Sequence, residues 1–131
     1  MKTFAVILLS FATFAVHAAD RVQAGQWETT LTMATGKPMV SKYCIGAAEA
    51  KAMNGDEAGL RKYLEESTAS NTKGRCLVKS VKLEDVTATV ALVCGKTEVS
   101  STTSYFGDRY ESKSSNGTTV AGKRLGNCPK P

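Results

Sequence analysis

The residues of this sequence best suited to bond chemistry are four cysteines, Cys44, Cys76, Cys94 and Cys128. An even number of cysteines is typical of a disulfide framework when a protein folds in an oxidising compartment. No Cys-x-x-Cys pair occurs, and the spacings of 32, 18 and 34 residues are unlike those of zinc fingers or ribbons. We therefore expect two structural disulfides, with no metal site and no cofactor.

Acid-base or nucleophilic catalysis finds little support in the sequence. The single histidine, His17, lies in an N-terminal apolar run that we expect to be removed, and a chain without histidine lacks the usual general base. Carboxylates at Glu65-Glu66, Glu84-Asp85 and Asp108 fall in expected turns or on a helix face, whereas an acid-base pair needs two carboxyl groups that converge in a pocket. Serine-hydrolase, phosphate-loop and zinc-peptidase motifs are absent. We predict no catalytic residues and no enzymatic activity.

The N-terminal segment predicts export. A positive start, Met1-Lys2-Thr3, precedes an almost unbroken apolar run over residues 4–16, and Val16 and Ala18 are suitable residues before a cleavage site. A membrane-spanning helix needs about 20 apolar residues, so the shorter run favours a signal peptide over an anchor. We expect cleavage after Ala18, a single mature domain over residues 19–131, and a periplasmic location.

The charge pattern bears on the kind of partner. Seventeen Lys and Arg against twelve Asp and Glu give a formal net charge of +5, and the basic residues are scattered rather than grouped. No interleaving of aromatic and basic residues provides a stacking platform for nucleic acid. We expect a monomer that binds no nucleic acid and has no transmembrane segment once the signal is removed.

Alternation of apolar and polar residues predicts the elements that position these side chains. It indicates strands over residues 25–33, 39–44, 76–83, 86–94, 97–106, 109–114 and 118–125. Helix signals occupy residues 47–53 and a stretch capped by Asp56, while residues 67–75, which lack large apolar side chains, are predicted to form a mobile loop. The expected fold is α+β and mainly β. It is an antiparallel meander sheet of about seven strands, able to curl into a half-barrel, with a helical insert between strands two and three.

The hairpin over residues 76–94 indicates how the cysteines pair. If its turn is centred on Asp85, Leu83 faces Thr87 and Cys76 faces Cys94. Directly opposite residues in a non-hydrogen-bonded pair have Cα atoms about 4.5 Å apart, which a disulfide can bridge. We predict a Cys76–Cys94 disulfide, which leaves Cys44–Cys128; the other two connectivities stay open at this point.

Several motifs in a fixed order resemble a known family. They are Gly25-Gln26-Trp27-Glu28 after a signal, Cys44-Ile45 before a helical insert, the cysteine-closed hairpin, and two C-terminal stretches over residues 105–110 and 122–128. Together they resemble the bacterial exported family catalogued as domain of unknown function 3617. The sequence departs from that pattern at Asn127, where an acidic residue is common. The family brings no established activity, so the resemblance implies no functional residues.

The Gly25-x-Trp27 motif also resembles the opening of lipocalins, in which a C-terminal basic residue packs on the tryptophan. Arg124 is the candidate for that contact here. The match spans only three residues, and the helix of this chain lies elsewhere in the sequence.

These features favour a non-catalytic binding module of the cell envelope. Trp27, Tyr105 and Tyr110 are candidates for the wall of a site that takes a small apolar molecule or lipid, although core packing also explains them. The alternative is a protein-interaction module or enzyme inhibitor that acts through residues 67–75 or an edge strand. A cavity beside Trp27 favours the first function, and a filled core favours the second.

Overall fold

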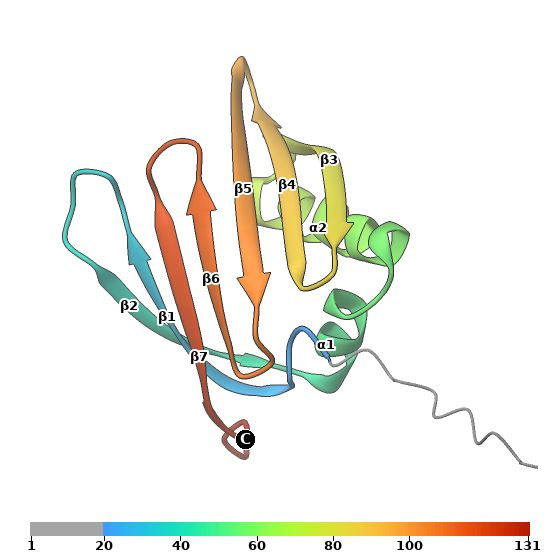
Figure 1. Ribbon diagram of the computed structural model, residues 1–131, viewed down its shortest axis with the longest axis vertical. Helices are drawn as coiled ribbons and strands as arrows, with labels where there is room; N and C mark the ends of the chain where they lie inside the picture. The colour runs from blue at the N-terminus through green and yellow to red at the C-terminus, as the bar shows by residue number, and fades with distance from the viewer. Residues whose placement is uncertain (1–19) are drawn as a thin grey trace, which may run out of the picture.

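The computed structural model of the protein describes residues 20–131. The predicted signal over residues 1–18 and its cleavage site after Ala18 lie outside the described residues. The described part contains one open, seven-stranded antiparallel sheet with two helices (Figure 1). In chain order, the elements are β1 (Gly25–Thr32), β2 (Met39–Ile45), α1 (Ala47–Met53), α2 (Glu57–Thr72), β3 (Cys76–Glu84), β4 (Thr87–Cys94), β5 (Thr97–Tyr105), β6 (Arg109–Ser114) and β7 (Thr119–Gly126).

The strand order is β2-β1-β7-β6-β5-β4-β3. Strands β3 to β7 form the predicted meander, and β7 then pairs with β1, so that the first and last strands lie side by side. The predicted α+β class with a helical insert is therefore confirmed. The sheet does not close, because β2 and β3 are its two edges rather than partners.

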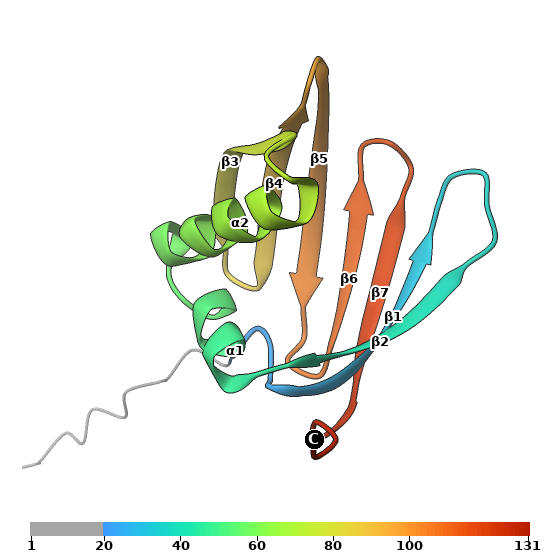
Figure 2. The ribbon, with the colours of Figure 1, turned by 180° about the vertical axis from the view of Figure 1, so that it is seen from behind.

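Both helices lie on the same face of the sheet, which we call the helix face; the opposite side is the outer face (Figure 2). Helix α2 crosses the β3–β5 half, and Leu60 packs there in a buried cluster with Val81 and Ala88. A second buried cluster joins Trp27 to α1. The half formed by β6, β7, β1 and β2 carries no helix over most of its length (Figures 1 and 2), and we call it the uncovered half.

The start of α2 follows the sequence prediction, but its end does not. The Gly59 N–H donates to Asp56 Oδ1 at 2.8 Å, which is the expected N-cap. The prediction of a loop over residues 67–75 is wrong, because the helix continues to Thr72 and ends where Lys73 and Gly74 adopt positive φ. Polar residues cost a packed helix only tenths of a kcal/mol each, so the first half of α2, which packs through Leu60, Tyr63 and Leu64, can extend into a polar second half.

The β3–β4 hairpin corrects the predicted register by one residue. Its turn has two residues, so Leu83 faces Ala88 instead of Thr87. An irregularity between Val78 and Ser80 then shifts the pairing and brings Cys76 opposite Cys94. The prediction placed the turn one residue too early and contained no bulge; the two errors cancelled at the cysteines.

Both predicted disulfides are confirmed. Cys76–Cys94 closes the hairpin with Cα atoms 4.2 Å apart. Cys44–Cys128 joins the edge strand β2 to the C-terminal tail with Cα atoms 5.6 Å apart. The two bonds thus hold opposite edges of the sheet.

The segment before β1 is built into the core. Val22 is 1% exposed, and its backbone N–H and C=O both bond the Asn54 side-chain amide, at 2.9 and 2.7 Å. Arg21 donates to the carbonyl groups of Met53 and Gly55 at the end of α1. Residues that precede the first predicted strand therefore fix α1 to the sheet.

Candidate functional site

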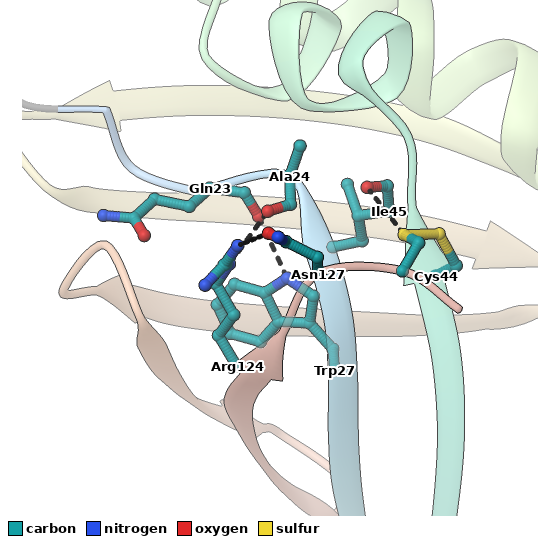
Figure 3. Close-up of a disulfide and its surroundings, with 8 residues drawn as sticks. Gln23, Ala24, Trp27, Cys44, Ile45, Arg124 and Asn127 are labelled. Atoms are coloured by element: carbon teal, nitrogen blue, oxygen red, sulfur yellow. Dashed lines mark hydrogen bonds between the residues drawn. A yellow bond between two sulfur atoms is a disulfide. The ribbon is translucent and has the colours of Figure 1, made fainter. Parts of the chain in front are cut away.

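Trp27 lies in a filled core. Its side chain is fully buried, and it packs with Val22, Ile45 and Ala50. The indole N–H donates to the Gln23 carbonyl at 3.0 Å (Figure 3). Trp27 lines none of the five principal depressions on the described part of the chain. The geometry therefore makes Trp27 a core residue rather than the wall of an open site.

Tyr105 and Tyr110 extend the same packing. The Tyr110 ring lies 5.6 Å from Trp27 and 6.1 Å from Tyr105, centroid to centroid. Its hydroxyl shares hydrogen bonds with Thr29 Oγ1 at 3.1 Å and Tyr43 Oη at 2.9 Å. Burial raises the pKa of Tyr105 and of Tyr43. The raised pKa values keep Tyr43 and Tyr105 neutral at ordinary pH, and the hydrogen bonds of its hydroxyl hold Tyr110 in place.

Arg124 pairs with Trp27 across β1 and β7, as the lipocalin-like pattern required. Its guanidinium, however, donates to the Ala24 carbonyl at 2.8 Å and to Asn127 Oδ1 at 3.1 Å (Figure 3). The approach is close enough that a Cβ on Gly25 would collide with the Arg124 side chain. Arg124 thus fastens the C-terminal tail to the start of β1.

The carboxylates that could serve catalysis lie apart on the surface. Glu65 pairs with Arg61 at 2.8 Å along α2, and Glu84 pairs with Lys82 at 2.8 Å on β3. Asp108 occupies the turn before β6. Within residues 20–131, no group of three or more His, Cys, Asp or Glu side chains is placed to hold a metal ion.

The two edges of the sheet differ in how their backbone groups are satisfied. At the β3 edge, the Leu83 N–H donates to Glu57 Oε2 at 3.0 Å, and the Cys76 N–H donates to Thr72 Oγ1 at 3.1 Å. Both acceptors come from α2, one from each end of the helix. The helix therefore occupies the outward N–H groups at the two ends of β3, and the irregularity at Lys79 interrupts the ladder between them, which opposes strand addition at this edge.

The alternation of hydrogen bonds in antiparallel pairs determines which residues of β2 point their N–H and C=O groups away from the sheet. The Arg124 N–H donates to the Asp108 carbonyl on the β6 side at 2.7 Å, so the preceding residue, Lys123, turns its backbone groups toward β1. Its partner Glu28 therefore bonds toward β7, and Lys42, which faces Glu28 from β2, turns its N–H and C=O away from the sheet.

The same alternation turns the backbone of Val40 outward. Among residues 20–131, no side chain or loop carbonyl accepts a hydrogen bond from the backbone N–H of Val40 or from that of Lys42. Six of the seven residues of β2 are exposed, and no bulge interrupts their pairing with β1. The β2 edge is thus a regular row of free donors and acceptors.

Apolar side chains surround this edge. Met39 is 52% exposed, Val40 61% and Tyr43 38%. Met39 and Tyr43 share the helix face with Trp27, since Tyr43 pairs with Trp27. Leu31 faces both Met39 and Val120 on the same side. We call the β2 edge with the helix-face residues Leu31, Met39, Tyr43 and Val120 the candidate site.

The outer face beside the candidate site is positive. Lys42, Glu28, Lys123 and Arg109 form one row across β2, β1, β7 and β6. The Glu28 carboxylate lies 4.0 Å from Lys42 Nζ and 3.3 Å from Lys123 Nζ. Lys42 and Lys123 therefore share one carboxylate, and this row of three cations and one carboxylate keeps an excess of positive charge.

Sequence reasoning named an edge strand as a candidate surface but missed the residues that distinguish the two edges. By type, Glu57 is an ordinary acidic residue directly after the predicted Asp56 cap, and Thr72 falls in the stretch predicted to form a loop. No local pattern shows that β2 stays at an edge, because that depends on β7 returning to pair with β1.

The comparisons with known proteins identify one family. The model of the family described as "Protein of unknown function (DUF3617)" matches residues 22–128, which is most of the chain. No curated protein and no solved structure matches the sequence or the fold. In the described residues, no helix has the length and apolar character required to cross a membrane.

Proposed function

We propose that this chain, which belongs to the DUF3617 family of proteins of unknown function, is an exported, non-catalytic protein-binding module of the cell envelope. Its β2 edge accepts an extended segment of a partner protein, which adds an eighth strand to the sheet. The observation that carries the proposal is the unprotected β2 edge, in contrast to the edge that α2 blocks.

The filled core supports this function over an enclosed ligand site. Small-molecule sites bury most of their ligand in a cleft or cavity, whereas Trp27 is fully buried and lines none of the five depressions described above. An added strand needs only free backbone groups and side-chain contacts on alternate positions. An enzyme inhibitor that presents this edge to its target is one form of the same function.

Export rests on the sequence and on the cysteines. The apolar run over residues 4–16 has the layout of a cleaved signal, and two disulfides persist in an oxidising compartment such as the periplasm. Cell fractionation followed by mass spectrometry tests this part. We expect a periplasmic protein that begins at Ala19, and a cytoplasmic protein with residue 1 retained would contradict export.

The strand-addition test uses proline at two edge positions. Val40→Pro removes an outward N–H and leaves the bonds to β1 intact, whereas Lys79→Pro changes the irregular position of the other edge. Envelope proteins bound by the wild-type chain should be retained by Lys79→Pro and lost by Val40→Pro. In the recovered complex, hydrogen exchange at the amides of Val40 and Lys42 should slow. A partner that binds both variants equally, with no change in exchange at β2, would contradict the proposal.

A second candidate is an apolar small molecule or lipid on the helix face of the uncovered half. The exposure of Met39, together with half-buried Leu31 and Val120, favours it. Native mass spectrometry of the protein from its own envelope should then show a bound lipid, which Met39→Ser should weaken. A protein free of lipid, with no thermal shift in lipid micelles, would eliminate this candidate.

A further inference from the structure

The specificity of the β2 edge depends on one charged residue in its middle. Lys42 lies on the outer face between Val40 and Cys44, and its side chain is 57% exposed. A lysine in an edge strand normally discourages strand addition, because an added strand must place a side chain directly against the charge. Lys42 therefore selects among strands that would otherwise pair.

The charge of Lys42 is only partly compensated within the protein. Its Nζ lies 4.0 Å from Glu28 Oε2, while Lys123 Nζ is nearer to the same carboxylate, at 3.3 Å. Arg109 continues the row on β6 and has no ion pair within residues 20–131. A carboxylate brought in opposite Lys42 would complete the row.

The two faces of β2 set different requirements for an added strand. Residues opposite Met39 and Tyr43 would lie on the helix face, against exposed apolar side chains. The residue opposite Lys42 would lie on the outer face, where opposite charges in a cross-strand pair are favourable and like charges are not. A second copy of this chain paired at Lys42 would place two ammonium groups together.

Resting on the proposed function, we infer that the partner segment is an extended, alternating strand with a carboxylate side chain opposite Lys42 and apolar side chains opposite Met39 and Tyr43. Lys42 is then the residue that determines which segments add to β2. The inference names the chemistry of the partner, an acidic amphipathic strand.

Three synthetic seven-residue peptides test the inference. Each has the sequence Val-Thr-Val-X-Val-Thr-Val, blocked at both ends and joined to a fluorophore by a Gly-Ser linker, with X as Glu, Gln or Lys. The length matches β2, and antiparallel pairing can place X opposite Lys42 with valines on the helix face. Fluorescence anisotropy with the disulfide-bonded chain gives the Kd of each.

We expect the Glu peptide to bind about two- to fivefold more tightly than the Gln peptide, and the Lys peptide to bind most weakly, as cross-strand charge pairs imply. Lys42→Glu should reverse this order. The control Lys82→Glu, an exposed lysine of the opposite edge that pairs with Glu84, should leave the order unchanged. A version of the Glu peptide with N-methyl groups on alternate residues of its pairing edge should lose binding without any change to the protein.

The outcomes separate this inference from the proposed function. Equal binding of the three peptides, blocked by Val40→Pro, would overturn the role of Lys42 and leave strand addition in place. No binding by any peptide, or binding unaffected by N-methylation, would overturn both. A dimer in light scattering that Val40→Pro converts to a monomer would also overturn the inference, because a second copy would then occupy β2.

Discussion

Either edge strand of this sheet could pair with a strand of another chain, and the two edges differ in how far this pairing is prevented. At β3, side chains from both ends of α2 accept the N–H groups of Leu83 and Cys76, and the pairing with β4 is irregular near Lys79. At β2, the corresponding groups face solvent, and Lys42 is the one charged residue of the strand. The helical insert thus protects one edge and leaves the other available, which is the arrangement expected of a module that binds through one edge.

The largest expected losses of stability concern the two disulfides, one at each edge. Cys44–Cys128 spans 84 residues and Cys76–Cys94 spans 18. The chain-entropy relation gives losses of about 4.5 and about 3 kcal/mol, respectively, when each is removed. Urea unfolding of C44A/C128A and C76A/C94A should therefore show the greater loss in the first variant. The reverse order would mean that Cys44–Cys128, at the β2 edge, contributes less to stability than Cys76–Cys94, at the β3 edge.

The second prediction compares the apolar residues of the two halves. Leu60 is 3% exposed beneath α2, while Met39 is 52% exposed on β2. Leu60→Ala should destabilise the fold by about 2–5 kcal/mol, and Met39→Ala by no more than about 0.5 kcal/mol. Thermal unfolding of both variants measures the difference. A comparable loss in Met39→Ala would show that the uncovered half is part of the core rather than a surface.

The third prediction concerns the two α2 side chains that accept hydrogen bonds from the β3 edge. Glu57→Ala with Thr72→Val deletes both acceptors and should cost about 1–3 kcal/mol in unfolding free energy. Amide exchange at Leu83 and Cys76 should accelerate toward the rates of Val40 and Lys42, measured by NMR. As a control, Lys42→Ala should change neither the stability nor exchange at β3. Unchanged protection of Leu83 in the double variant would show that α2 does not guard that edge.

The smallest expected effect is a dependence on alkaline pH. Tyr63 lies on α2, which packs on β3. Burial and the 2.6 Å hydrogen bond from Tyr63 Oη to Glu49 Oε1 raise the pKa of this residue. Burial does the same for Tyr43 in the uncovered half. An unfolded tyrosine ionises near pH 10, so these groups stabilise the fold fully below that pH, and stability falls as the pH rises above it.

The test of this pH effect compares Tyr63→Phe with Tyr43→Phe. Each substitution should reduce the decline in unfolding free energy between about pH 9.5 and 11. A decline that is unaffected in both variants would assign the alkaline sensitivity to other groups.

Much of the fold could be predicted because its determinants are local. The Asp56 cap is confirmed by its bond to Gly59. The Cys76–Cys94 bond followed from the hairpin, although the register between them was wrong by one residue at Leu83. The length of α2 was underestimated because tertiary packing at Leu60, not the propensity of residues 67–72, sustains the helix.

The candidate site was less accessible to sequence reasoning. Trp27 stood out as the single tryptophan, but its role in a filled core became clear only from its contacts with Val22 and Ile45. The residues that matter for the edges, Glu57 and Lys42, are ordinary surface residues by type. Their importance comes from which strand ends the sheet, and that depends on contacts between segments far apart in the chain.

The irregularity in β3 places a parity constraint on the hairpin. From the turn as far as Ser80, paired residues are offset so that, if the same residues paired without the bulge, Cys76 would face Gly95 instead of Cys94. Lys79 is the extra residue, so its deletion should leave a regular ladder in which Cys76 still faces Cys94 and the bond still forms. Deletion of a β4 residue such as Val90, with the bulge kept, should instead bring Leu77 opposite Cys94 and leave both thiols unpaired.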